Sequence, residues 1–126
     1  MLASRISIPD QVPGMTPEAV QLLKERVAAA NEILREEADK LADHTIDAEW
    51  KPSPVDPRGR VDLILSLGDV RFTHQISLEE LSEPTKIRQR LRDELWYLVA
   101  TYVMYNQRDI TRLLKEIKQD RVAAGT

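Results

Sequence analysis

The chain has 126 residues and no cysteine, with 18 basic and 21 acidic side chains and a net charge of −3. This length suits one domain with its own core, and the lack of cysteine excludes disulfides, thiolate metal sites and a cysteine nucleophile. The acidic excess argues against a protein that coats nucleic acid through overall charge. Because no stretch reaches the about 20 apolar residues of a membrane span and residues 1–15 lack the apolar core of a secretory signal, we expect a soluble cytoplasmic protein.

Residues 1–15 are expected to form an irregular arm, because two prolines and a glycine interrupt them. Thr16 and Pro17 then predict the start of a helix, as its N-cap and first helical residue. Apolar residues follow at spacings of three and four, interrupted only at Glu37, so this long helix should face a core and run to about Ala42.

Three antiparallel strands are expected next, beginning with residues 44–51, whose apolar and polar side chains alternate. Gly68-Asp69 suits a two-residue type II′ turn, because glycine tolerates the positive φ of the first central position. The resulting hairpin has one apolar face and one largely polar face that should meet water. Its expected pairs are Leu67 with Val70, Leu65 with Phe72, Leu63 with His74, and Val61 with Ile76.

A long C-terminal helix is expected to begin at 82–84. About 36 residues would span about 54 Å, whereas a seven-residue strand reaches only about 23 Å. Since no glycine or proline occurs at 85–124, we expect a continuous helix or a mild kink near Asn106–Asp109, with 122–126 frayed. The sequence thus predicts one α+β domain over residues 16–121, with this helix packed on one face of a three-stranded meander.

The centre of the last helix carries the most informative pattern, an uncharged run of thirteen residues that holds four of the six aromatic side chains. A helix that is apolar all round must be covered on several sides. The side with Leu91, Leu95, Leu98 and Tyr102 can pack on the hairpin, but the other side has no obvious partner within the chain. We therefore expect a non-enzymatic interaction protein of the adaptor, chaperone or assembly-factor type, most simply a homodimer. Its expected interface comprises Trp96, Val103, Met104, Tyr105, Ile110 and Leu114.

Basic residues on the same helix suggest an alternative partner. They lie roughly opposite the core-facing stripe, and an aromatic residue lies among them, as on surfaces that follow a phosphate backbone. They could equally pair with acids, such as those of the first helix in this or a second copy. The order helix, three strands, helix resembles that of the double-stranded-RNA-binding domain and of small nucleoid-associated proteins, which implies nucleic-acid binding. The alternative nucleic-acid face comprises Lys86, Arg90, Tyr97, Arg108, Arg112 and Lys115.

Candidate catalytic groups are few. His74 is the one polar residue on the apolar hairpin face, where it could act as a base, ligand or switch, or be a hydrogen-bonded core histidine. The first helix carries an acidic stripe, which we interpret as a solvated or basic-partnered face because a calcium site needs about six converging oxygens. No metal-binding or nucleophile spacing occurs. The sequence therefore predicts no catalytic residue, no metal and no cofactor. The acidic stripe comprises Glu32, Glu36, Asp39 and Asp43.

Overall fold

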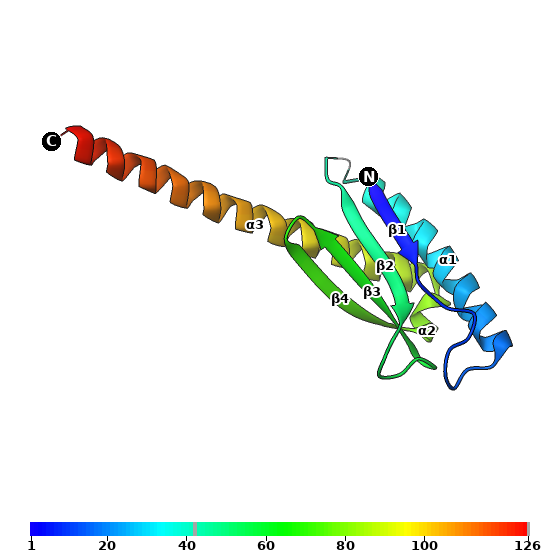
Figure 1. The fold of residues 1–126 in the computed structure, drawn as a ribbon. Coiled ribbons are helices and arrows are strands. Elements are labelled where there is room, and N and C mark those ends of the chain that lie inside the picture. Colours follow the sequence, from blue (N-terminus) through cyan, green and yellow to red (C-terminus); the bar gives the residue numbers. More distant parts are fainter. Residues whose placement is uncertain (42, 126) are drawn as a thin grey trace.

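The computed structural model describes residues 1–41 and 43–125, with the side chains of 109, 110, 113 and 119–125 left aside. The strands form one mixed sheet in the order β1-β2-β3-β4, and α1 and α3 cover the same face of it (Figure 1). The expected α+β class, with a long helix packed on one face of a sheet, is confirmed. The elements are β1 (Leu2–Ile6), α1 (Pro17–Asp39), β2 (Ile46–Pro52), β3 (Arg60–Leu67), β4 (Val70–Ser77), α2 (Leu78–Leu81) and α3 (Pro84–Gly125).

The predicted count of three strands is wrong, because part of the expected N-terminal arm forms strand β1. This strand runs parallel to β2, with Leu2 beside Ile46. Its inward-facing Ser4 accepts hydrogen bonds from Asn31 Nδ2 at 3.1 Å and Arg35 Nη2 at 3.2 Å, both on α1. A polar residue at the centre of a five-residue strand removes the apolar alternation that marks a strand in the sequence.

The hairpin between β3 and β4 is confirmed, with all four predicted pairs in register. Gly68 has φ +57°, and no non-glycine residue in the described chain has a positive φ, as a type II′ turn at Gly68-Asp69 requires. A β-carbon on Gly68 would lie only 2.8 Å from Cε2 of Tyr102 on α3. Glycine is therefore needed both for the turn and for the close approach of α3.

Helix α1 begins as predicted, with the Thr16 hydroxyl oxygen accepting a hydrogen bond from the Ala19 N–H at 3.1 Å. It ends at Asp39, short of the predicted end at Ala42, which lies outside the described residues. The buried side of α1 is tied to the sheet by a polar contact, since Trp50 Nε1 donates to Asn31 Oδ1 at 3.0 Å. Trp50 is itself fully buried, so this bond satisfies a donor that water cannot reach.

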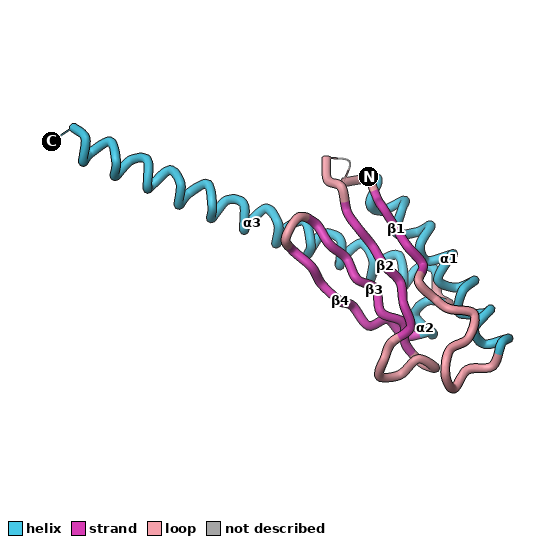
Figure 2. The backbone as a smooth tube through the Cα atoms, in the orientation of Figure 1, coloured by secondary structure: helices cyan, strands magenta, loops and turns pink. Residues whose placement is uncertain are grey.

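Helix α3 is one unbroken helix of 42 residues, which confirms the predicted continuity. It includes residues 122–125, and residue 126 of the predicted tail lies outside the described residues. A helix of this length spans about 63 Å, and its second half projects far from the rest of the chain (Figures 1 and 2). Every described side chain from Val103 to Lys118 is exposed. We call Val103–Gly125 the α3 extension, and residues 1–102 the body.

Candidate interaction site on the C-terminal helix

The core-facing side of α3 is occupied within the chain, as the sequence predicted. Leu91, Leu95 and Leu98 are fully buried, and Tyr102 is partly buried against the hairpin turn. The buried stripe ends at Tyr102, because the hairpin turn is the last part of the sheet that α3 passes. From this point the helix has no covering element of its own chain.

A second apolar band runs along α3 on a different side. Trp96 and Leu114 are 18 residues apart, which is about five full turns, so they lie above one another. The other members fall within a band about 140° wide around the axis. Their exposed fractions are 57% for Trp96, 39% for Val103, 61% for Met104, 62% for Leu114 and 51% for Ile117. We call these five residues the apolar seam.

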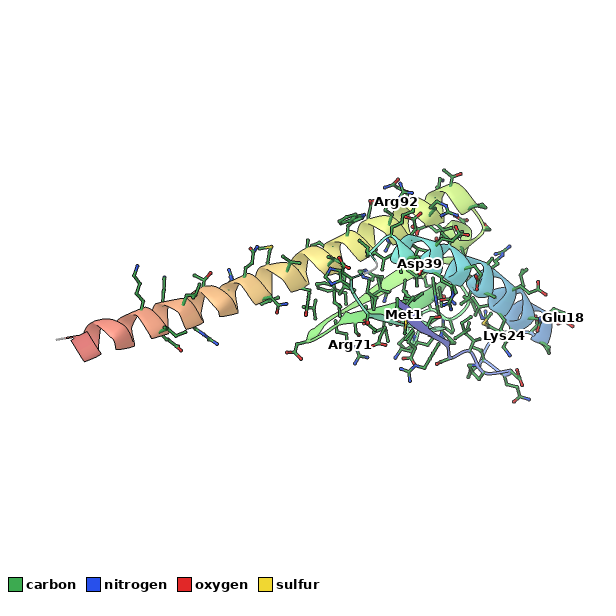
Figure 3. All side chains as sticks on the ribbon, turned by 90° about the horizontal axis from the view of Figure 1, so that it is seen from above. Met1, Glu18, Lys24, Asp39, Arg71 and Arg92 are labelled. Atoms are coloured by element: carbon green, nitrogen blue, oxygen red, sulfur yellow. The ribbon has the colours of Figure 1, made fainter. Side chains whose placement is uncertain are left out.

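The apolar seam continues the side of α3 that contacts α1 in the body. Trp96 and Val103 lie within about 40° of Arg92 around the helix axis, and Arg92 binds Glu37 of α1. Figure 3 shows Arg92 beside the end of α1 that carries Asp39. Helix α1 ends there, so the extension carries an α1-facing side onward without α1 to cover it.

The predicted interface is therefore only partly one surface. Trp96, Val103, Met104 and Leu114 belong to the seam, whereas the side chain of Ile110 lies outside the described part. Tyr105 is turned away from the seam. It lines a groove of about 370 Å³ between the hairpin and α3, together with Asp69, Phe72, Tyr102 and Asn106.

The predicted nucleic-acid face is divided by internal contacts of the body. Arg90 Nη1 binds Glu80 Oε2 at 3.1 Å, its Nε binds Glu94 Oε1 at 3.0 Å, and its Nη2 donates to the Gln75 carbonyl oxygen at 3.2 Å. Lys86 pairs with Glu83 at 3.0 Å, which raises the pKa of the Lys86 amine.

Tyr97, from the same predicted face, packs on Phe72 with ring centroids 5.0 Å apart. The remaining members, Arg108, Arg112 and Lys115, lie together on the extension beside Met104, Gln107 and Thr111. The basic surface available on α3 is thus shorter than the sequence suggested and shares the extension with the seam.

A cluster that the sequence did not identify joins the C-terminal end of α1 to the part of α3 that lies in the body. Glu37 is only 3% exposed, and its carboxylate binds Arg88 at 3.0 Å, Arg92 at 3.1 Å and Lys40 at 3.1 Å. Hydrogen bonds from Arg92 lower the pKa of Glu37 to about 2, against the opposing effect of burial. The available signal was the position of Glu37, the one charged interruption of the apolar stripe of α1, because a buried carboxylate needs cationic partners.

On the inner face of the sheet, only one of the two ring nitrogens of His74 has a hydrogen-bond partner. Its Nδ1 lies 3.0 Å from Glu94 Oε2, and its buried Nε2 has no hydrogen-bond partner. Burial lowers the pKa of His74, an effect that Glu94 opposes and Arg90 reinforces. Neutral His74 therefore donates from Nδ1 to Glu94. Within residues 1–41 and the described side chains that follow, no three His, Asp or Glu groups converge to hold a metal ion.

The outer face of the sheet carries a polar groove of about 570 Å³, lined by Arg5, Glu49, Ile64 and Arg71 among others. Arg5 pairs with Glu49 at 3.6 Å across its edge. On the same face Asp62 is 5% exposed, and its buried Oδ1 has no partner. The groove therefore offers mixed charge rather than a site selective for one ion.

Comparison of the chain with protein-family models, curated proteins and solved structures found no match. Across the described residues, no helix combines the length and apolar character required to cross a membrane. The interpretation of function consequently depends on the geometry of α3.

Proposed function

We propose that this protein is a non-enzymatic interaction protein that associates with a second copy of itself through the α3 extension. The observation that carries the proposal is the apolar seam, whose five large side chains remain 39–62% exposed on a helix that leaves the body. Patches of this kind on small proteins mark interaction sites.

A partner helix would also stabilise the extension. Helices in proteins gain most of their stability from packing an apolar face, and the described side chains from Val103 to Lys118 are exposed. The seam has the spacing of a helix-pairing surface, since Val103 follows Trp96 by 7 residues and Ile117 follows Val103 by 14. A partner helix is the occupant that this pattern favours.

Light scattering across micromolar concentrations tests the proposal, with a dimer expected for the wild type. Val103→Glu combined with Leu114→Glu places two charges in the seam and is expected to give a monomer whose body stays folded. Gln75→Glu is the matched control, because it adds a charge on the exposed outer face of the sheet while Arg60 Nη1 can still donate to it. A wild type that stays monomeric at all concentrations would refute the proposal.

Nucleic-acid binding is a second candidate, favoured by the exposed Arg108 and Lys115 on the extension. It predicts a gel shift at about 50 mM salt that weakens steeply as salt rises. Arg108→Glu with Lys115→Glu should abolish the shift, whereas Lys24→Gln on α1 should not. No shift at the low salt concentration would remove this candidate.

A further inference from the structure

We infer that the α3 extension of one copy lies along the outward face of α1 in the second copy, and that the contact is reciprocal. The inference rests on the proposed self-association and specifies which surface of the partner covers the seam. The alternative arrangement pairs one extension with the other extension and leaves the outward face of α1 in water.

The outward face of α1 combines three acidic residues with one small and one large apolar side chain. Its members recur at alternating spacings of four and three, which places them on one side of a helix. All are exposed, and Leu22 is 46% exposed although it is a large apolar residue. The face comprises Glu18, Leu22, Glu25, Ala29 and Glu32.

Charge divides between the two parts of the chain in the way this contact requires. Residues 103–125 contain five basic and three acidic side chains, whereas residues 1–102 contain 13 basic and 18 acidic side chains. The extension therefore carries +2 and the body −5. Two extensions side by side would repel each other, whereas an extension beside α1 brings opposite charges together.

The same two helices already use this charge pairing within one chain. Arg88 and Arg92 of α3 bind Glu36 and Glu37 of α1 at 2.7–3.1 Å. Among the side chains that the structure describes, Arg108 and Lys115 of the extension form no ion pair, and Glu25 of α1 forms none either. In the contact between copies, these residues would form ion pairs of the same kind as those between α1 and α3 in the body.

Length and side-chain size also match. Helix α1 has 23 residues, and Val103–Gly125 is equally long, so each spans about 34 Å. Figure 3 shows α1 between Glu18 and Asp39 on the surface of the body and the extension projecting away from it. Ala29 allows close approach of the helix axes, while Leu22 offers apolar contact to Met104 and Leu114 of the seam.

A reciprocal contact closes the assembly at two copies. Each copy supplies one extension and one outward face of α1, and a two-fold axis satisfies both contacts at once. The basic extension of each copy then crosses the acidic body of the other.

A charge-swap experiment distinguishes this arrangement from pairing between extensions. One variant carries Glu25→Lys and Glu32→Lys, which makes α1 repel the extension of the same variant. The other carries Arg108→Glu and Lys115→Glu, which makes its extension repel α1. Each variant alone should dimerise at least about tenfold more weakly than the wild type, and their mixture should recover a one-to-one dimer, because both contacts then join opposite charges.

Sedimentation of the two variants, separately and mixed, reads out the result, and recovery in the mixture shows that both variants are folded. Wild-type association should also weaken as salt rises from about 50 to about 500 mM. If the variant with the altered α1 alone associates as tightly as wild type, the inference is wrong and the proposed self-association stands. If the wild type does not associate at all, both fail. If both variants weaken but their mixture does not recover, the inference is likewise overturned.

Discussion

Arg92 of α3 donates two parallel hydrogen bonds to Glu37 of α1, from Nε to Oε2 and from Nη2 to Oε1, each 3.1 Å long. This fork geometry is the strongest form of arginine–carboxylate pairing. It fixes the end of α1 against α3 about three helical turns before the extension begins. The relative placement of the two helices therefore depends on a charge cluster as well as on apolar packing.

Removing the Glu37 carboxylate is expected to destabilise the body. Glu37→Gln retains the shape but leaves Arg92 without its anionic partner and Arg88 with Glu36 alone, at a cost of about 2 kcal/mol, since hydrogen bonds to charged groups contribute about 1.5–3 kcal/mol. Urea unfolding followed by circular dichroism measures the loss. Glu36→Gln is the control, because Glu36 is exposed and should cost less than about 1 kcal/mol.

The same carboxylate predicts a pH dependence of stability. The pKa of Glu37 is about 2 in the folded chain and near its ordinary value of 4.5 when unfolded. Its contribution is therefore fully present above pH 4.5 and is lost as the pH falls toward 2. The difference in stability between wild type and Glu37→Gln should shrink over this window. A difference that stays constant would contradict the assignment.

His74 predicts a second pH effect at higher pH. Burial lowers its pKa, so below about pH 6.5 the unfolded chain takes up a proton that the folded chain resists. The stabilisation is present above that pH and declines as the solution is acidified. The thermal unfolding midpoint of His74→Gln should therefore change less between about pH 7.5 and about pH 5.5 than that of the wild type, and an equal change in both would contradict the prediction.

Gly68→Ala is expected to destabilise the hairpin and its contact with α3. Alanine is strained at a φ of +57°, and its methyl group would lie only 2.8 Å from Tyr102 Cε2. A strained backbone position of this kind costs about 1–3 kcal/mol. In a Tyr102→Leu background the steric part should disappear and the backbone part remain, so the cost measured by thermal unfolding should fall without reaching zero.

Trp96 provides an optical test of association. It is 57% exposed, whereas Trp50 is fully buried. Dilution of a dimer that covers the seam should shift the fluorescence emission to longer wavelength and increase quenching by acrylamide. Trp96→Phe leaves Trp50 as the single tryptophan, and its emission should not depend on concentration. A wild-type spectrum that is also independent of concentration would count against the seam as the interface.

The sequence predicted the elements whose signals are local. Thr16 and Pro17 mark the start of α1, Gly68 marks the hairpin, and the absence of helix breakers predicted one continuous α3. Strand β1 escaped prediction because its identity depends on a parallel partner 44 residues away, and Ser4 gives it no apolar pattern of its own. Parallel pairing of distant segments leaves no turn signal in the sequence.

The sequence identified which residues of α3 are candidates for the site, but only partly which of them share one exposed surface. Helical spacing separated the core-facing Leu95 from the exposed Trp96 correctly. It could not show that Arg90 is engaged by Glu80, because α2 and α3 meet only in the folded chain. Nor could it show that Tyr105 turns toward the hairpin groove, since that depends on where the sheet ends along α3.

The unbroken path of α3 from the body into the extension has a mechanical consequence. The alignment of Leu114 and Ile117 with Trp96 and Val103 is set by the number of residues between them, because each residue turns the helix by about 100°. Inserting one alanine after Asn106 would rotate most of the extension by that angle, whereas inserting seven would nearly restore the phase and move it outward by about 10 Å. The surface that the extension presents to a partner is therefore set by the number of residues between the body and each seam side chain.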